Sequence, residues 1–190
     1  MNKKIISIGG GGKNILTYLE KNLKRAIDFD FFAINTHKQN DAGLNTIQNI
    51  HIENAQTKNG TRRNPELGEQ VFIDNAKMLN NLLKNTDSVI LITCLGGGTG
   101  SGIIPKFLEL ITEANIQTNV IVCMPFKFES YTKIANKALK KIRSDDYSLY
   151  VLNLEDLYSK RNKNLSLADA FKLVSHNILN IVENDLLIES

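Results

Sequence analysis

One glycine-rich segment, residues 95–104, constrains the fold of this chain more than any other. It reads Leu-Gly-Gly-Gly-Thr-Gly-Ser-Gly-Ile-Ile, and five of the seven residues from Gly96 to Gly102 lack a Cβ atom. The backbone there can adopt positive φ and approach a ligand closely. An apolar run at 88–94 precedes the glycines, and residues 103–114 follow with helical spacing of their apolar residues. A strand, a glycine turn and a helix start together direct free N–H groups at one point, which predicts a phosphate-binding loop with Thr99 and Ser101 as hydroxyl donors.

Two other interpretations of the segment agree less well with the pattern. A flexible surface loop rarely separates a buried strand from an apolar helix. A Walker loop has a lysine directly after its last glycine, whereas Ile103 follows Gly102 here. On the phosphate interpretation, a bulky residue at Gly98 or Gly100 is predicted to abolish ligand binding and to leave the fold intact.

A second glycine cluster follows the first predicted strand, residues 4–8, and consists of Gly9, Gly10, Gly11 and Gly12. We expect these glycines to form a turn before a helix at 14–26. Their spacing fits neither the dinucleotide fingerprint, which needs a glycine at Lys13 or Ile15, nor a Walker loop. Taken alone, this cluster is a weak indication of a second backbone cradle.

Alternating strands and helices continue along the chain and indicate an α/β fold. Further strands are predicted at 29–35, 47–52, 118–124 and 147–152, and further helices at 65–84, at 131–143 and from Ser166 onward. This pattern predicts a doubly wound, mostly parallel sheet with helices on both faces, so residues 1–190 would form one nucleotide-binding domain. The residues alone leave open whether the ligand is a mononucleotide or a dinucleotide.

Polar residues near the ends of these strands offer further ligand contacts. The cations of the segment 58–63 include Arg62 and Arg63, for which phosphate contact and a solvated surface turn are about equally consistent. Asn64 and Pro65 are typical of a helix start. Glu129 is placed either to bond a ribose hydroxyl or to cap the next helix.

The composition excludes several classes of protein. A net charge of +3 without a basic block does not suggest nucleic-acid binding. The two cysteines, Cys94 and Cys123, are too few for a disulfide scaffold and are expected to be buried free thiols in a reducing compartment. No apolar run approaches the roughly 20 residues of a membrane span. We therefore expect a cytoplasmic protein.

The run Gly96–Gly102 resembles the signature of the tubulin/FtsZ family of filament-forming GTPases. Other stretches resemble that family in the same order along essentially the whole chain: 8–14 its first glycine loop, 33–36 its second strand end, 64–68 its third helix start, 125–129 its ribose loop and 166–171 the start of its central helix. The resemblance implies a tubulin/FtsZ-type nucleotide-binding domain that binds GTP or GDP, with Mg²⁺ accompanying the triphosphate.

The resemblance also implies roles for individual residues. Both glycine clusters would hold the phosphates, Asn14 would contact the guanine, Glu129 the ribose, and Phe171 would stack on the base. Other positions of the implied site depart from the family. Lys13 replaces a glycine, His37 an aspartate and Lys133 an arginine, Thr61 to Arg63 replace a loop of small residues, and Ser175 and His176 replace an Asn-Asp pair.

The exchange at His176 bears on the choice of base. A carboxylate accepts two hydrogen bonds from guanine, whereas a neutral imidazole offers one acceptor, so the loss costs about 1.5–3 kcal/mol of discrimination. We expect a weakened preference for guanine.

The chain stops at Ser190, before the loop with which members of this family complete the hydrolytic site of the next subunit, and before their second domain. We therefore expect a GTP-binding cytoskeletal or cell-division protein with slow intrinsic hydrolysis, which assembles head-to-tail with itself or with a full-length relative. Two alternatives stay open: a nucleotide hydrolase in which Arg62 or Arg63 acts in cis, and an interaction module that has lost its nucleotide.

Overall fold

The computed structural model describes residues 1–38, 46–127, 130–142, 145–159 and 166–186. In this part of the chain, six strands form one parallel sheet in the order β3-β2-β1-β4-β5-β6. The strands are β1 (Lys3–Ile8), β2 (Phe29–Asn35), β3 (Ile47–His51), β4 (Ser88–Cys94), β5 (Gln117–Met124) and β6 (Ser148–Asn153). The predicted parallel sheet is confirmed.

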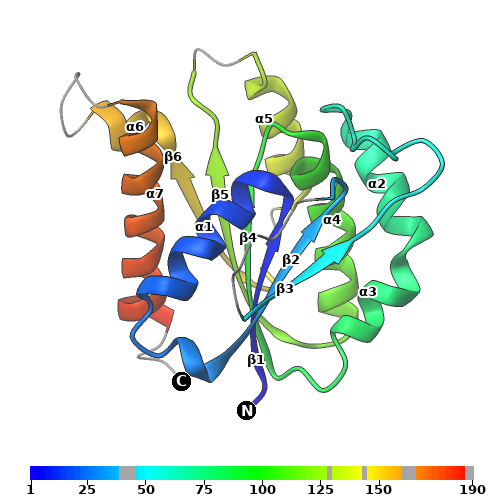
Figure 1. Cartoon of the computed structure of the whole chain (residues 1–190), viewed down its shortest axis with the longest axis horizontal. Coiled ribbons are helices and arrows are strands. Elements are labelled where there is room, and N and C mark those ends of the chain that lie inside the picture. The colour runs from blue at the N-terminus through cyan, green and yellow to red at the C-terminus, as the bar shows by residue number, and fades with distance from the viewer. Residues whose placement is uncertain (39–45, 128–129, 143–144, 160–165, 187–190) are drawn as a thin grey trace.

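Helices cover both faces of the sheet (Figure 1). One face carries α1 (Gly9–Asn22), α6 (Leu154–Ser159) and α7 (Leu167–Ile181), and the other carries α2 (Pro65–Asp74), α3 (Ala76–Leu82), α4 (Gly98–Glu113) and α5 (Thr132–Lys141). A short 3₁₀ helix, η1 (Ala26–Asp28), precedes β2, and a π-helical turn, η2 (Val182–Leu186), follows α7. The doubly wound class is therefore confirmed as well.

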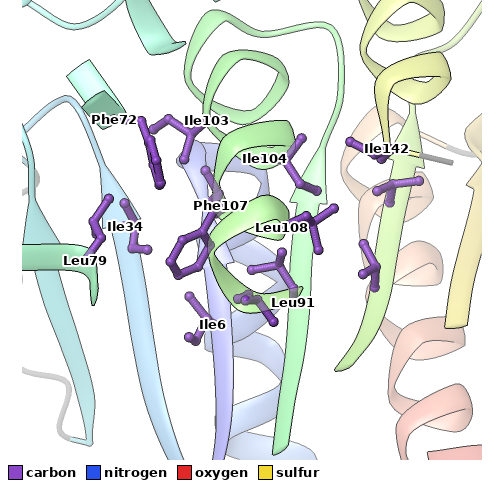
Figure 2. Packing of buried hydrophobic residues seen from close by; sticks show 14 of the residues in the cluster. Ile6, Ile34, Phe72, Leu79, Leu91, Ile103, Ile104, Phe107, Leu108 and Ile142 are labelled. Carbon is purple, nitrogen blue, oxygen red and sulfur yellow. The ribbon is translucent and has the colours of Figure 1, made fainter. Parts of the chain in front are cut away.

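Two apolar clusters hold the layers together. Behind the sheet, Phe107 of α4 is fully buried, packs edge-on against Phe72 of α2 with ring centroids 6.1 Å apart, and lies over Ile6 and Leu91 (Figure 2). On the opposite face, α1 and α7 bury a second cluster that includes Leu16 and Ile178. Burial of each such side chain contributes about 1.5–3 kcal/mol to the stability of the fold. The packed layers in turn hold the strand ends, from which the polar loops extend, in fixed positions.

Helices α1 and α4 begin earlier than the sequence predicts. The glycines at 9–12 form the first turn of α1 instead of a turn before it, and α4 begins at Gly98 instead of Ile103. Glycine has a poor intrinsic helix propensity, so contacts with neighbouring elements must outweigh that cost at both starts.

The helix predicted at 65–84 is divided at Asn75. Its side-chain amide donates to the carbonyl oxygen of Val71 (2.8 Å) and to that of Glu53 (3.2 Å). The second bond comes from a loop distant in sequence, so no local pattern indicates the division. Helix α6 was not predicted either.

Helix α7 has the start predicted at Ser166, but the apolar stripe that its spacing predicts is only partly buried. This stripe consists of Phe171, Val174, Ile178, Ile181 and Val182. Ser166 caps it, accepting a hydrogen bond from the amide of Asp169 (3.2 Å). Val174 and Ile178 are buried as expected, but Phe171 is 46% exposed. Leu186, the last residue of η2, is buried, and residues 187–190 lie outside the described part. Among the described helices, none is long and apolar enough to cross a membrane.

Candidate functional site

The polar loops gather at the carboxyl edge of the sheet, where β1, β2, β4 and β5 end (Figure 1). After β1 the chain moves outward to β2 and β3, and from β4 it moves the other way to β5 and β6. The strand order therefore reverses between β1 and β4. Open α/β sheets bind ligands in the crevice at this point.

Two helix N-termini meet at the same point. We call Gly9–Gly12 loop 1 and Gly96–Gly102 loop 2. A Cβ atom built on Gly9 would lie 3.4 Å from the backbone nitrogen of Gly100, so the first turns of α1 and α4 touch. Neither helix has a side-chain cap or an acidic residue in its first turn. Two uncapped N-termini present free N–H groups and positive dipole ends to an anion.

Three glycines of loop 2 pack against protein. A Cβ atom on Gly98 would lie 2.5 Å from Thr61 Oγ1 and 2.6 Å from the Asn64 nitrogen, and one on Gly102 would lie 2.2 Å from the Pro65 oxygen. On Gly100, a Cβ atom would lie 2.5 Å from Thr93 Oγ1, the hydroxyl that donates to the carbonyl of Ile8 at the end of β1 (3.0 Å). The prediction that substitutions at Gly98 or Gly100 leave the fold intact is therefore wrong.

Gly97 differs from these three, since a Cβ atom there would have no heavy atom within 4 Å. Gly96 adopts a φ of 102°, which only glycine adopts easily, and turns the chain out of β4. The buried hydroxyl of Ser101 accepts a hydrogen bond from the Gly96 amide (2.8 Å) and so closes the loop on itself.

Loop 1 packs downward onto β4. A Cβ atom on Gly11 would lie 2.7 Å from Cys94 Sγ, and one on Gly12 would lie 2.9 Å from the carbonyl oxygen of Ile92. Gly9 has a φ of 79° and Gly10 is exposed. Most glycines of both loops are thus required by close backbone packing, which sets the two helix starts side by side.

A cluster of three threonine hydroxyls lies at the start of α4. Thr99 Oγ1 is 2.7 Å from Thr36 Oγ1 and 3.1 Å from Thr61 Oγ1. Thr36 and Thr61 are buried, whereas Thr99 is half-buried. The sequence identified Thr99 as a hydroxyl donor but missed its two partners. The position of Thr36 directly after β2 was the available signal.

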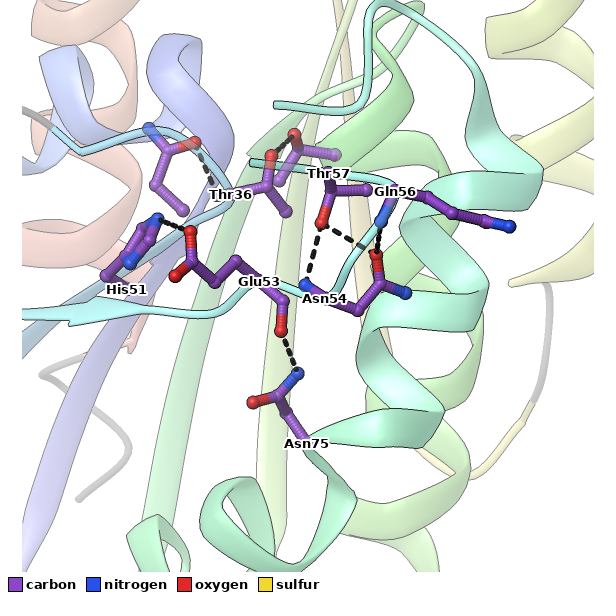
Figure 3. A network of polar contacts seen from close by, with 9 residues as sticks. Thr36, His51, Glu53, Asn54, Gln56, Thr57 and Asn75 are labelled. Carbon is purple, nitrogen blue, oxygen red and sulfur yellow. Dashed lines mark hydrogen bonds and ion pairs between the residues drawn. The ribbon is translucent and has the colours of Figure 1, made fainter. Parts of the chain in front are cut away.

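A network around Asn54 holds the segment that delivers Thr61 (Figure 3). The side-chain oxygen of Asn54 accepts hydrogen bonds from the amide of Gln56 and the hydroxyl of Thr57, both at 3.0 Å. Its side-chain nitrogen donates to Asp74 (2.7 Å), and this bond, followed by one from Gln70, lowers the pKa of Asp74. The connection between β3 and α2 is therefore tied to α2.

The two candidate arginines lie next to Thr61 and differ in their contacts. Arg62 and Arg63 both have positive φ, 47° and 64°. The Arg63 guanidinium lies 4.2 Å from the ring centroid of Tyr131 and donates to its hydroxyl. Tyr131 in turn packs against Gly96: a Cβ atom built on Gly96 would lie 3.1 Å from the Cβ atom of Tyr131. Arg63 therefore links the segment before α2 to the segment before α5, and both arginines are exposed.

The residues expected at the base lie on α1 and α7, which pack side by side. Asn14 and His176 are exposed. The buried Ser175 hydroxyl donates to the Phe171 carbonyl (3.1 Å), and the Asn177 side-chain amide donates to the Leu173 carbonyl (2.7 Å). Elsewhere, His37 and Lys133 are exposed and Lys13 is half-buried, while Glu129 lies outside the described residues.

A cavity of about 230 Å³ lies between α2, α4 and α5. Its lining includes Ser101 and Gly102, so it adjoins loop 2, and the Lys141–Glu69 ion pair (3.5 Å) spans α5 and α2 beside it. No group of three or more potential metal-ligating side chains occurs in the described ranges.

Comparisons with known proteins agree with this architecture. Residues 2–161 match the family model described as Tubulin/FtsZ family, GTPase domain. The chain is similar to the cell division protein FtsZ of Aquifex aeolicus (30% identity over 174 residues, 90% of this chain and 47% of that protein). It is also similar to that of Buchnera aphidicola subsp. Acyrthosiphon pisum (32% over 179 residues, 93% of this chain and 46% of that protein).

Solved structures show the same fold. An FtsZ dimer from M. jannaschii superposes with a TM-score of 0.82 at 26% identity, covering 96% of this chain and 53% of that chain. CetZ2 from Haloferax volcanii gives a TM-score of 0.80 at 19% identity, over 96% of this chain and 57% of that chain. The chain spans about half the length of the curated relatives that it matches.

Proposed function

Because this chain belongs to the tubulin/FtsZ family and matches the model of that family's GTPase domain, we propose that it binds GTP or GDP at the carboxyl edge of its sheet. The paired N-termini of α1 and α4 carry this proposal. They touch at Gly9 and Gly100 and lack side-chain caps, whereas α2 is capped by Asn64, whose side chain accepts from the Glu66 amide (2.9 Å). The phosphates would take the place of the missing caps.

The two loops divide the phosphate contacts. Loop 1 would contribute backbone N–H groups alone, since none of its residues has a side chain. Loop 2 would contribute backbone N–H groups around Gly97 and the half-buried hydroxyl of Thr99, which Thr36 and Thr61 hold in place. Fixed donors lose little entropy when they bind an oxyanion.

The base would lie along the pair formed by α1 and α7. Asn14 and Phe171 are both exposed, and Phe171 offers an apolar ring for stacking. His176 is the exposed residue at the place of the family's base-reading carboxylate. The expected preference for guanine over adenine is therefore small.

Mg²⁺ would accompany the triphosphate and neutralise part of its charge. No cluster of three potential protein ligands occurs in the described residues, and phosphate oxygens and water commonly supply most ligands of this ion. The proposed site is consistent with a cation held chiefly by the nucleotide.

The test is whether the purified 190-residue chain carries or binds a guanine nucleotide. Protein should be denatured, and the released nucleotide identified by its ultraviolet spectrum and by chromatography. Titrations with fluorescent GTP and ATP analogues should then show saturable binding with a modest preference for GTP. Absence of binding to either nucleotide by folded protein would favour the interaction-module alternative.

A hydrolase with a cis arginine is a second candidate. It is favoured by the two consecutive positive-φ arginines beside Thr61 and Thr99, because strained backbone often marks functional positions. Arg63 is engaged by Tyr131, so Arg62 is the better candidate to contact a phosphate. Phosphate release by the chain alone that falls about 10³-fold in Arg62→Ala, with unchanged GTP affinity, would establish this activity.

We also propose that the domain joins head-to-tail assemblies with itself or with a full-length relative, since a solved FtsZ relative is described as a dimer. Such contacts join two different faces of a subunit. Sedimentation with GTP, with GDP and without nucleotide tests this proposal, and a single monomeric species in all three samples would contradict it.

A further inference from the structure

Cys94 and Cys123 lie side by side at the ends of two neighbouring strands. The parallel register of β4 and β5 makes them direct partners, so their side chains project from the same face of the sheet. Cys123 is buried and Cys94 is half-buried. A hydrogen bond with the Cys94 thiol, together with burial, raises the pKa of Cys123 well above its ordinary value. The register thus sets the two side chains next to each other on this face.

This placement suits a disulfide bond. Neighbouring strands lie about 4.8 Å apart, within the range of roughly 4.4–6.8 Å that a disulfide requires between its two Cα atoms. The chain contains two cysteines, so a third thiol does not compete within one molecule. Cys94 is the more exposed of the two and Cys123 is buried, so a peroxide reaches Cys94 more easily.

Cys94 also contacts both glycine loops. The Cys94 sulfur lies beneath the first turn of α1, where a Cβ atom built on Gly11 would be 2.7 Å from it. Its carbonyl oxygen would be 2.6 Å from a Cβ atom on Gly100, in the first turn of α4. The amide of Leu95, the next residue, donates to the carbonyl of Cys123 (2.9 Å). A change at the thiol pair therefore reaches the place where the two helices start.

We propose that Cys94 and Cys123 are a redox modification site, which a peroxide closes into a disulfide that loosens the first turn of α1. The Cys94 thiolate attacks one peroxide oxygen and the O–O bond breaks, giving a sulfenic acid and, from hydrogen peroxide, water. The Cys123 sulfur then displaces the hydroxyl group of the sulfenic acid, which leaves as water with the thiol proton. In total, two thiols are oxidised and one hydrogen peroxide is reduced to two waters.

The disulfide alters the support beneath loop 1. Bond formation brings the two sulfur atoms to about 2.05 Å, which moves Cys94 Sγ toward β5 and away from Gly11. Close packing between the sulfur and the glycine backbone is then lost. The consequence for nucleotide affinity rests on the proposed function, whereas disulfide formation and the loosening of α1 do not.

Hydrogen peroxide added to the 190-residue chain, without nucleotide, tests the modification. Maleimide labelling after denaturation should show loss of both thiols, and intact mass should fall by two hydrogen atoms in a monomer that dithiothreitol restores. Cys94→Ser, which retains the size of the side chain, should keep the Cys123 thiol reduced. Sulfinic acid, a disulfide between molecules, or persistence of both thiols would overturn the proposal.

Amide hydrogen exchange then tests the effect on α1. Exchange at residues 13–16, whose amides lie four positions beyond the carbonyls of Gly9 to Gly12 in α1, should become about tenfold faster in the oxidised chain and stay unchanged in peroxide-treated Cys94→Ser. Equal exchange in both redox states would overturn the coupling. GTP affinity should fall about tenfold on oxidation. If the reduced chain binds no GTP, the proposed function fails, while the thiol and exchange results still decide this inference.

Discussion

Loops 1 and 2 look alike in sequence, yet they pack in different directions. Loop 1 lies on β4, with Gly11 over Cys94 and Gly12 over Ile92, and carries no side chain of its own. Loop 2 also meets β4, at Gly100, but it packs in addition sideways against the segment that enters α2, at Thr61 and Pro65, and carries a hydroxyl into a threonine cluster. A cluster of glycines thus marks close approach of backbone to several different neighbours, and only some of its positions face a ligand.

Substitution at Gly98 should have the largest effect on the fold. A methyl group there meets Thr61 Oγ1 and the backbone of Asn64, which cannot move without shifting α2. We expect Gly98→Ala to lower the free energy of unfolding by about 3 kcal/mol. Urea denaturation of the variant measures this loss.

Gly97→Ala is the matched control, one residue away. Its backbone is extended, and an added methyl group has no neighbour within 4 Å, so the loss should stay below about 1 kcal/mol. Equal losses at the two positions would contradict the division of loop 2 into packing and open glycines.

A larger side chain at Gly97 should act on the ligand instead of the fold. Gly97→Leu extends into the open space at the start of α4, where phosphate oxygens would lie. GTP affinity should fall by about a hundredfold, or 2.7 kcal/mol, with stability close to that of Gly97→Ala. Titration with a fluorescent GTP analogue gives the ratio. Unchanged affinity in the folded variant would show that loop 2 does not hold the phosphates.

The sequence predicted the strands of the sheet better than the residues at which α1 and α4 begin. Strands β2 and β4 were predicted to the residue because each is a largely apolar run that follows an aspartate and is soon followed by polar residues or glycine. The early starts of α1 and α4 depend on contacts such as Gly12 with Ile92, which join residues 80 positions apart. Local propensity disfavours glycine in a helix, so pattern alone placed these starts too late.

The site shows the same division. Its location followed from the two glycine loops, because parallel strands end at one edge and the helix starts must lie there. The partners of Thr99 are 63 and 38 residues away, and Tyr131 is 68 residues from Arg63. Such pairs carry no periodicity, so only the folded chain shows that Thr99 is held by two hydroxyls and that Arg63 has an aromatic partner.

The threonine cluster gives loop 2 a property that loop 1 lacks. Thr99→Val removes a hydroxyl that contacts two buried hydroxyls, and leaves Thr36 and Thr61 with fewer partners. We expect a loss of about 1–2 kcal/mol in stability, measured by urea denaturation. Thr99→Ser keeps the hydroxyl and should retain most of that energy. A Thr99→Ser variant as unstable as Thr99→Val would contradict this assignment, because serine retains the hydroxyl.

The nucleotide base should lie on the same side of the site as loop 1, because α1, which begins with loop 1, packs beside α7. His176→Asp restores a two-oxygen acceptor at an exposed position, so the preference for GTP over ATP should rise about tenfold. The ratio of the two dissociation constants measures it. Asn177→Asp adds the same charge where the side chain bonds the Leu173 carbonyl, and should leave the ratio unchanged. Equal changes in both variants would indicate a general effect of charge.

The smallest effect should come from Ser7, one of two buried serines whose substitutions change stability in opposite directions. Ser7 lies beneath loop 1, near Gly12, and among the described residues its hydroxyl has no hydrogen-bond partner. The hydroxyl of Ser101 is also buried but accepts from the Gly96 amide. Ser7→Ala removes an unsatisfied group and should raise the free energy of unfolding by up to about 1 kcal/mol, whereas Ser101→Ala leaves a buried amide unpaired and should lower it by about 1–3 kcal/mol. Thermal and urea denaturation of both variants, without nucleotide, test this contrast. A loss of unfolding free energy in Ser7→Ala as large as that in Ser101→Ala would contradict this contrast, because it would show that the Ser7 hydroxyl also makes a stabilising hydrogen bond.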